Sequence, residues 1–374
     1  MTAAAEPGAP PPRPPRRWRG AVAGRLGDLA LGLLCCWLFA DLAAPGLQPA
    51  DAGEFQLVAR DLGVAHPPGY PLYTMLAHAF GRAATQPSVV ALFGAGDLAV
   101  ADPWLGRVPL GPDRWPWAVN LFSTLLALVV LAALFAAARR LTGLRLAGVV
   151  AVACLAFTPT FQAQASIANI RMPTALLAAL VLLAAVRVVT PSPAASPTAD
   201  RDLVGLAFTL GLAAGHHPSL AFLGLPVALA VAWRRPAGLR RPRTLAAMLG
   251  AAVVALAPLA YLPLRDRAGA VLAPGNLDTL RGLAYHALAL GFRGDALYFD
   301  DVATLVDRLR VLADIAVLQF GGFRLALAGL GLAALARRDG AAAVLVAGAA
   351  GIVAALAVAY RAPQTVEYLL PAYV

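Results

Sequence analysis

Long apolar runs recur along this 374-residue chain, and they constrain its fold more than any other feature. A helix needs about 20 apolar residues to cross a bilayer, because lipid cannot satisfy backbone N–H and C=O groups. Only 13% of the residues are charged, whereas a soluble domain carries about 25% charge. The sequence therefore predicts an all-α integral membrane protein, a multi-span bundle of about eight to ten transmembrane helices. The runs lie near 26–44, 116–138, 145–161, 172–189, 203–216, 218–233, 245–264, 316–336 and 341–360.

Some segments fit this pattern less well. The runs 203–216 and 218–233 are short and separated by a proline, so two tilted spans and one broken hairpin are both open. Segment 70–84 is too short and too polar to span, and it fits an interfacial or re-entrant helix. The first run follows a Pro- and Arg-rich stretch, residues 1–25, which we expect to be disordered. No small-residue cleavage site follows that run, so we predict an uncleaved first span.

The arginines predict the orientation of these spans. The chain has no lysine, and its arginines gather in short segments between apolar runs, which is typical of cytoplasmic loops rather than of a nucleic-acid-binding face. Starting from a basic N-terminus in the cytoplasm, the span count puts every other basic segment on that same side. We therefore expect a multi-pass protein of the plasma membrane with a cytoplasmic N-terminus. The basic segments are 139–145, 187–201, 234–243 and 337–338.

The non-cytoplasmic side then receives most of the chemically reactive side chains. It holds a large first loop, 45–115, and a second large loop, 265–315, within a transmembrane domain that covers residues 26–374. Ionisable groups in a bilayer cost roughly 2.5–3.5 kcal/mol each at its centre, so those kept near a membrane tend to mark function. We expect the chemistry on this face.

The strongest candidates are Asp51 and Glu54, which directly follow the first apolar run. One reading is a capping box in which Asp51 is the N-cap of a helix. The other places both carboxylates on one face of a helical turn, where one acts as general base on a hydroxyl. The two readings are compatible.

A proline-rich string, His66-Pro-Pro-Gly-Tyr-Pro71, follows twelve residues after Glu54. Proline restricts the residue before it to extended conformations, so His66 and Tyr70 are held out of helix. This is either a stiff loop that starts the next helix or a rigid mount for an imidazole over a phosphate or sugar.

Further candidates come from distant segments of the same face. His216 and His217 stand between two apolar runs, and adjacent histidines suit phosphate or hydroxyl contact better than zinc. Arg265 lies at the outer end of a span, against the orientation trend, so it is either an anion ligand or a side chain that snorkels to headgroups. Asn276 and His286 share the second large loop with it. Arg171 has the same two readings with less support. No zinc-protease, serine-hydrolase or P-loop motif occurs.

An ordered series of motifs resembles one known family, the bacterial members of the group that contains the eukaryotic transmembrane protein 260, a protein O-mannosyltransferase. That group belongs to the GT-C superfamily of integral-membrane glycosyltransferases. The resemblance covers nearly the whole chain after Asp41. Its strings are DAGEFQLVARDLGVAHPPGYPLY at 51–73, WAVNLFSTL at 117–125, GLAAGHHPSLAFLGLP at 211–226, YLPLRDRAGAVLAPGN at 261–276 and VEYLLPAY at 366–373.

The resemblance implies a GT-C-like fold and a glycosyltransferase that moves a sugar, mannose by analogy, from a polyprenyl-phosphate donor. The acceptor would be a hydroxyl of an exported protein or of a cell-envelope glycan. Asp51 and Glu54 would be catalytic, while the histidines, Tyr70, Arg265 and Asn276 would bind substrate, with no metal ligand assigned. A monophosphate leaving group does not require a metal, so a divalent cation is left open. No nucleic-acid partner is expected.

Two departures and one alternative remain. The segment 167–171 carries Asn169 and Arg171 where the family pattern leads us to expect an acidic residue. The chain stops at Val374, directly after a family-like string, so a natural short form and a truncated fragment are both open. A transporter or flippase for a lipid-linked glycan would also need polar groups in the membrane. Transporters tend to place them near the midplane, often with internal repeats, and we see no repeat.

Overall fold

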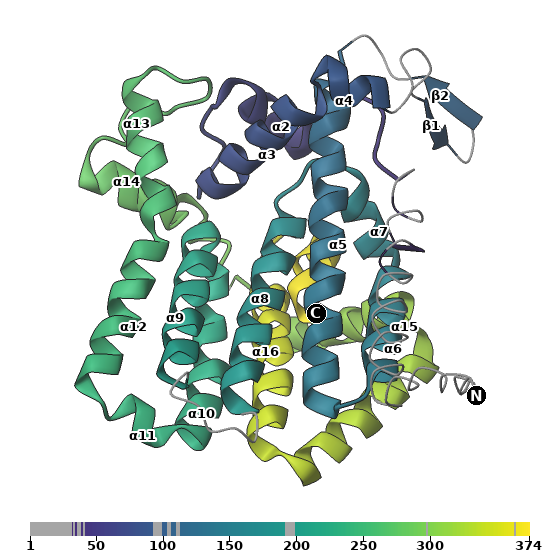
Figure 1. The fold of residues 1–374 in the computed structure, drawn as a ribbon, viewed down its shortest axis with the longest axis vertical. Helices are drawn as coiled ribbons and strands as arrows, with labels where there is room; N and C mark the ends of the chain where they lie inside the picture. The colour runs from purple at the N-terminus through teal and green to yellow at the C-terminus, as the bar shows by residue number, and fades with distance from the viewer. Residues whose placement is uncertain are drawn as a thin grey trace, which may run out of the picture.

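The computed structural model describes residues 42–92, 99–102, 106–109, 113–190, 199–296, 298–362 and 364–374, with four single positions before residue 42. The predicted disordered segment 1–25 and most of the first predicted span, 26–44, lie outside the described residues. Helices dominate the rest (Figure 1). The fold is all-α as predicted, and one short antiparallel pair accompanies the helices: β1 (Ala99–Asp102) pairs with β2 (Gly106–Pro109), with Ala99 opposite Pro109.

The helices run in the following order. Ahead of α5 come α2 (Ala50–Asp61), α3 (Pro71–Ala84) and α4 (Pro87–Leu92). The bundle then contains α5 (Trp115–Thr142), α6 (Arg145–Ala156), α7 (Pro159–Ser166), α8 (Arg171–Val189), α9 (Ala199–His216), η1 (Pro218–Leu223), α10 (Gly224–Arg234), α11 (Pro236–Leu239) and α12 (Pro242–Ala255). After these come η2 (Ala257–Ala260), α13 (Tyr261–Arg267), α14 (Leu280–Ala287), η3 (Leu290–Phe292), α15 (Val302–Arg338), α16 (Gly340–Ala359), α17 (Thr365–Tyr368) and η4 (Leu370–Ala372).

Five helical segments in the described part of the chain are long and apolar enough to cross a membrane, and the bent pair α6–α7 would make a sixth. The five are α5, α8, α12 continued through α13, α15 and α16. Two predicted spans fall short: α9 carries three charges in its first turns, and η1 with α10 makes only a short apolar helix. The protein is a multi-pass membrane protein, and the larger span count stays a prediction.

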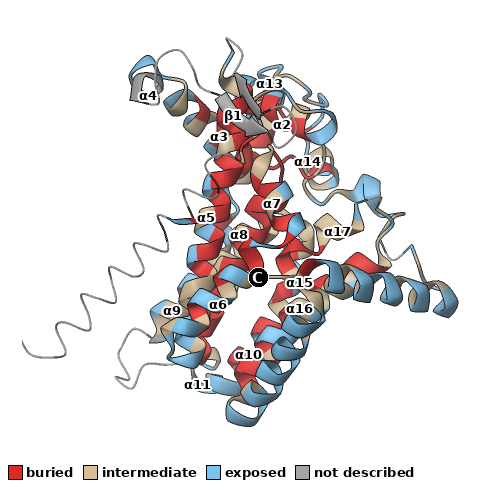
Figure 2. Ribbon diagram, turned by 90° about the vertical axis from the view of Figure 1, so that its right-hand side faces the viewer, coloured by how far each residue is buried: buried red, intermediate tan, exposed pale blue. Residues whose placement is uncertain are grey.

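The core of the bundle is α8, which is apolar on all sides and packs against α5, α9 and α16. In its most apolar stretch 72% of the residues are buried, compared with 6% in α15. Figure 2 shows the same contrast, with buried residues along α5 and α8 and an exposed α15. A helix that is buried on all sides is also apolar on all sides, and an exposed apolar helix is suited to contact lipid. α15 also kinks at Gly321, whose φ of 69° is left-handed.

The two ends of the bundle differ in chemistry. The helices α2, α3, α13 and α14 lie together at one end, and α11 lies at the other (Figure 1). The predicted basic segments meet at the α11 end, where Arg140 reaches the Thr190 carbonyl (3.2 Å) and Arg241 pairs with Asp200 (3.0 Å). The described basic segments therefore share one end of the bundle, as the arginine pattern predicts.

Candidate functional site

The acidic motif opens α2, but Asp51 is not a helix cap. The N-cap is Pro49, Ala50 is the first helical residue, and no side chain caps this end. The capping-box interpretation is therefore wrong, because the helix begins two residues earlier than that motif needs. Asp51 instead lies exposed in the first turn, with no hydrogen bond to another described residue. Its carboxylate is available for chemistry.

Glu54 forms the best-defined contact of the site, with His66. One carboxylate oxygen accepts the His66 backbone N–H at 2.6 Å, and the other lies 2.8 Å from the ring Nδ1. The side chains of Glu54 and His66 are 22% and 31% exposed, so the pair is partly shielded from water. Glu54 thus holds the proton on Nδ1 and leaves Nε2 of His66 open to the site.

This contact changes the pKa of both partners. Burial opposes ionisation of Glu54, but the hydrogen bonds from His66 outweigh it and the pKa of Glu54 falls below its ordinary value. Burial likewise disfavours the charged imidazole, yet Glu54 and Asp51 outweigh it and the pKa of His66 rises. The two shifts agree in favouring an ion pair of carboxylate and imidazolium.

The turn from His66 to Tyr70 is held by its surroundings. Gly69 has φ of 92°, and a Cβ there would lie 2.7 Å from Leu262 Cδ2 and 3.1 Å from His286 Nε2. His286 is buried and its Nε2 lies 3.1 Å from the Ala65 carbonyl. Burial lowers the pKa of His286, which keeps the ring neutral as a donor to that carbonyl. The described contacts of His286 thus support the loop, and its predicted substrate contact stays a prediction.

Tyr70 links this turn to the distant histidine pair. It is the left-handed N-cap residue of α3 and is 3% exposed, so it lies outside the helix as predicted. Its ring centre lies 5.6 Å from that of His66, 5.4 Å from that of His216 and 6.2 Å from that of His217, on which it stacks. The structure therefore brings together four of the residues that the sequence singles out, from segments about 150 residues apart.

The two histidines differ in how they are fixed. His216 is buried and its Nε2 lies 3.2 Å from the Thr174 hydroxyl, which in turn donates to the Ile170 carbonyl. His217 accepts the Ser219 N–H at Nδ1 (3.2 Å), so its neutral ring carries the proton on Nε2. His216 is a packed residue at the edge of the site, and His217 presents the ring that stacks on Tyr70.

Arg171, which the sequence supports only weakly, lies in the site. It begins α8, is 9% exposed and pairs with Glu367 at 3.5 Å, and its guanidinium carbon lies 3.7 Å from the centre of the Tyr368 ring. Its charge acts on His66, Tyr70 and His217. Two features of the sequence could have identified Arg171. It lies at the predicted outer end of a span, and it belongs to the segment 167–171 that departs from the family pattern. Its two partners come from the C-terminal family-like string.

Arg265 and Asn276 are not gathered into this cluster. Arg265 donates to the carbonyls of Leu62 (2.7 Å) and Asp61 (3.2 Å), at the far end of α2. That end is about 15 Å along the helix from Asp51 at 1.5 Å per residue. Asn276 is exposed in the loop before α14, where its carbonyl accepts from Thr279. Both lie in the predicted loop 265–315, and their predicted substrate contacts stay predictions.

A buried amide anchors α2 to the bundle. Asn120 on α5 is fully buried, accepts from Gln56 (2.9 Å) and from the Ala168 N–H (2.8 Å), and donates to the Ala44 carbonyl (2.8 Å). It thereby joins α2 and α5 to the segments before α2 and before α8. Asn120 lies in the WAVNLFSTL string, where a polar residue in an apolar run is the signal that could have identified it.

Asp51, Glu54 and His66 also form the one group of three His, Cys or acidic side chains in the described ranges that could hold a metal ion. Their ligand atoms lie within 4.8 Å of one another. Both Glu54 oxygens are already engaged by His66, so a cation would compete with that contact. The chemistry of the set suits a divalent ion, but the ion pair already satisfies Glu54 and His66, which leaves only Asp51 unengaged.

Comparison with known proteins confirms the predicted resemblance. Residues 51–94 match the N-terminal domain of protein O-mannosyl-transferase TMEM260, and residues 113–261 match the dolichyl-phosphate-mannose-protein mannosyltransferases. The chain is 24% identical to protein O-mannosyl-transferase tmem260 of Dictyostelium discoideum over 315 residues, 81% of this chain and 35% of that protein. It is 31% identical to TMEM260 of Mus musculus over 142 residues, 38% of this chain and 16% of that protein. The chain thus spans little more than a third, at most, of these relatives' length.

A solved structure shares the fold. ArnT from Cupriavidus metallidurans, bound to undecaprenyl phosphate, matches with a TM-score of 0.60 at 17% identity, over 94% of this chain and 59% of that one. The predicted GT-C-like helical membrane fold is confirmed.

Proposed function

We propose that this chain is an integral-membrane glycosyltransferase that moves a sugar, mannose carried on polyprenyl phosphate, to an acceptor hydroxyl. The observation that carries the proposal is the open Asp51 carboxylate beside the Glu54–His66 pair, with Arg171 at the same end of the bundle. The similarity to O-mannosyl-transferases supports the reaction class, and the match that begins at Asp51 includes Glu54, His66 and Tyr70.

The reaction needs a base for the acceptor and a cation for the leaving group. Asp51 takes the proton of the acceptor hydroxyl, whose oxygen forms the new bond to the sugar C1. The bond from C1 to the phosphate oxygen breaks, and its electron pair stays on the polyprenyl phosphate. Charge therefore builds up on the phosphate, where a pre-oriented cation stabilises the transition state.

Two side chains supply that positive charge. The raised pKa of His66 favours the imidazolium, whose Nε2–H is free to donate to a phosphate oxygen. Arg171 is largely buried, and its guanidinium suits a phosphate. His217, whose ring stacks on the buried Tyr70, provides a partly exposed ring beside them on which a sugar can pack. This set neutralises a monophosphate without a divalent ion.

The topology supports a location on the non-cytoplasmic face of the plasma membrane, with a cytoplasmic N-terminus. The site lies at the end of the bundle away from the described basic segments, and such segments stay in the cytoplasm. The acceptor is then a hydroxyl of an exported protein or of an envelope glycan. Arg265 and Asn276 border the outer loop through which such an acceptor would approach.

The donor class is tested in membranes that contain the full-length protein. We expect transfer of radiolabelled mannose from polyprenyl-phosphate mannose and none from a nucleotide-activated mannose. Transfer from the nucleotide donor alone would overturn the proposal. Movement of a lipid-linked glycan across the bilayer without any transfer would favour the transporter alternative.

A further inference from the structure

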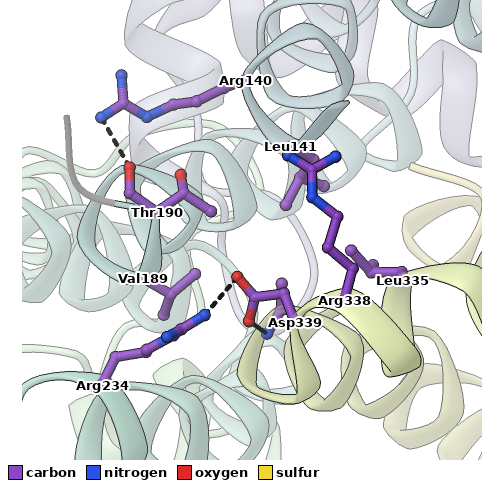
Figure 3. Close-up of a pocket in the computed structure, with 9 residues that line it drawn as sticks. Arg140, Leu141, Val189, Thr190, Arg234, Leu335, Arg338 and Asp339 are labelled. Carbon is purple, nitrogen blue, oxygen red and sulfur yellow. Dashed lines mark hydrogen bonds and ion pairs between the residues drawn. The ribbon is translucent and has the colours of Figure 1, made fainter. Parts of the chain in front are cut away.

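A concave site lies at the basic end of the bundle, far from the acidic motif. It is a cavity of about 410 Å³ where the ends of α5, α8, α10 and α15 meet the start of α16. Figure 3 shows the guanidinium groups of Arg140, Arg234 and Arg338 around it, each from a different helix. Its lining includes Val189 and Ala342, which are fully buried. We call this the basic pocket.

The basic pocket has more positive charge than its own residues neutralise. Asp339 is bound to Arg234 at 2.5 Å and accepts the Ala342 N–H at 3.0 Å as the N-cap of α16, so this carboxylate is already engaged. Arg140 gives one N–H to the Thr190 carbonyl at 3.2 Å and keeps its other donors. Arg338 forms no hydrogen bond or ion pair with another residue that the structure describes. Three arginines thus face one carboxylate, and two positive charges remain.

Ordinary topogenic arginines would explain the charge but not its arrangement. Such arginines stand separately at exposed positions, as Arg243 does in the first turn of α12. In the basic pocket they converge from three helix ends on one hollow with a partly apolar lining, at the level where the spans end. Guanidinium groups bind phosphate oxygens through paired N–H donors, and basic pockets between transmembrane helices bind anionic headgroups.

The helix beside the pocket indicates where the ligand comes from. α15 leads to Arg338, and Leu327 and Leu330 on it are 49% and 68% exposed. Acyl chains can pack along this apolar surface while the phosphate enters the pocket, whereas a free phosphate would leave the surface uncovered. We propose that the basic pocket binds the phosphate group of an anionic glycerophospholipid. This site is independent of the proposed sugar transfer.

The test is a lipid titration of the purified chain in neutral detergent, followed by native mass spectrometry. Phosphatidylglycerol should bind more tightly than phosphatidylcholine with the same acyl chains. Arg338→Gln should weaken phosphatidylglycerol binding about tenfold, since a hydrogen bond to a charged group is worth roughly 1.5 kcal/mol or more. The control Arg243→Gln removes the same charge from an exposed position at the same end and should leave the affinity within about twofold.

Two further arms make the result decisive. Arg338→Lys keeps the positive charge but loses the paired N–H donors, so its affinity for phosphatidylglycerol should lie between those of the unmodified chain and Arg338→Gln. If Arg338→Gln unfolds without lipid, Arg338→Lys takes its place in the comparison. Inorganic phosphate in excess should not displace phosphatidylglycerol. The proposal would be overturned if the two lipids bound equally well, or if Arg243→Gln weakened phosphatidylglycerol binding as much as Arg338→Gln does. It would also be overturned if inorganic phosphate alone saturated the site.

Discussion

Asn120→Ala should destabilise the protein strongly, because this side chain joins four segments inside the bundle. The substitution leaves the Ala168 N–H without an acceptor in a fully buried position. It also removes the bonds to Gln56 (2.9 Å) and to the Ala44 carbonyl (2.8 Å). Gln56 keeps a weaker alternative in the Gly46 carbonyl at 3.2 Å.

The size of the effect follows from these contacts. A buried donor without a partner costs about 1–3 kcal/mol, and each of the other two hydrogen bonds contributes about 1 kcal/mol net. The expected loss of unfolding free energy is therefore about 3–5 kcal/mol. Sugar transfer should fall with it, because α2 would lose its anchor to α5.

Equilibrium unfolding of the purified chain in mixed micelles, followed by tryptophan fluorescence, measures this loss. Ser123→Ala is the matched control: Ser123 is fully buried on the same helix, and its hydroxyl has no hydrogen-bond partner among the described residues. We expect the control to change stability by less than about 1 kcal/mol. A loss in Asn120→Ala no larger than in the control would refute the reasoning.

Other predictions concern the acidic motif and its loop. Folding lowers the pKa of Glu54 from its ordinary value of 4.5. Glu54 therefore stabilises the fold at pH values above 4.5, and this stabilisation is lost as the pH falls through the lowered pKa. Folding raises the pKa of His66 from its ordinary value of 6.5. His66 therefore stabilises the fold at pH values below 6.5, and this stabilisation is lost as the pH rises through the raised pKa. The stability difference between the unmodified chain and Glu54→Gln should thus peak between pH 4.5 and 6.5, and thermal unfolding that shows no such peak would contradict the ion pair. Gly69→Ala should lower the unfolding temperature more than Gly143→Ala, because both positions have positive φ but only the Cβ at Gly69 meets Leu262 and His286. Chelation of divalent ions with EDTA should leave sugar transfer unchanged, and activity that is lost and then restored by a divalent ion would assign Asp51, Glu54 and His66 to a metal site.

The spans are predictable from the sequence where the run of apolar residues alone decides the structure. Helices α5, α8 and α16 match the runs 116–138, 172–189 and 341–360. The apolar pattern alone does not show whether α9 crosses the membrane. Charges at its start and a proline after its end leave its apolar run close to the minimum length of a span. The first predicted span has no counterpart for comparison, since it falls largely outside the described residues.

The site is predictable where neighbouring residues determine it and not where distant contacts do. The acidic motif and the proline-rich string that follows it point to Glu54 and His66, and the structure pairs them at 2.8 Å. The sequence presents Arg265 as a candidate anion ligand, but its partners are the carbonyls of Leu62 and Asp61, 203 and 204 residues away. The sequence gives Arg171 only weak support as a site residue for the same reason, because its partner Glu367 is distant in the sequence, near the C-terminus.

The central claim is that Asp51 acts as the base on the acceptor hydroxyl. The most direct measurement is the rate of mannose transfer from polyprenyl-phosphate mannose by the full-length protein that carries Asp51→Asn, together with its affinity for the donor. Asparagine keeps the size of the exposed side chain and removes the basic oxygen, so the rate should fall by at least about a hundredfold while donor binding is retained. An unchanged rate would contradict the account.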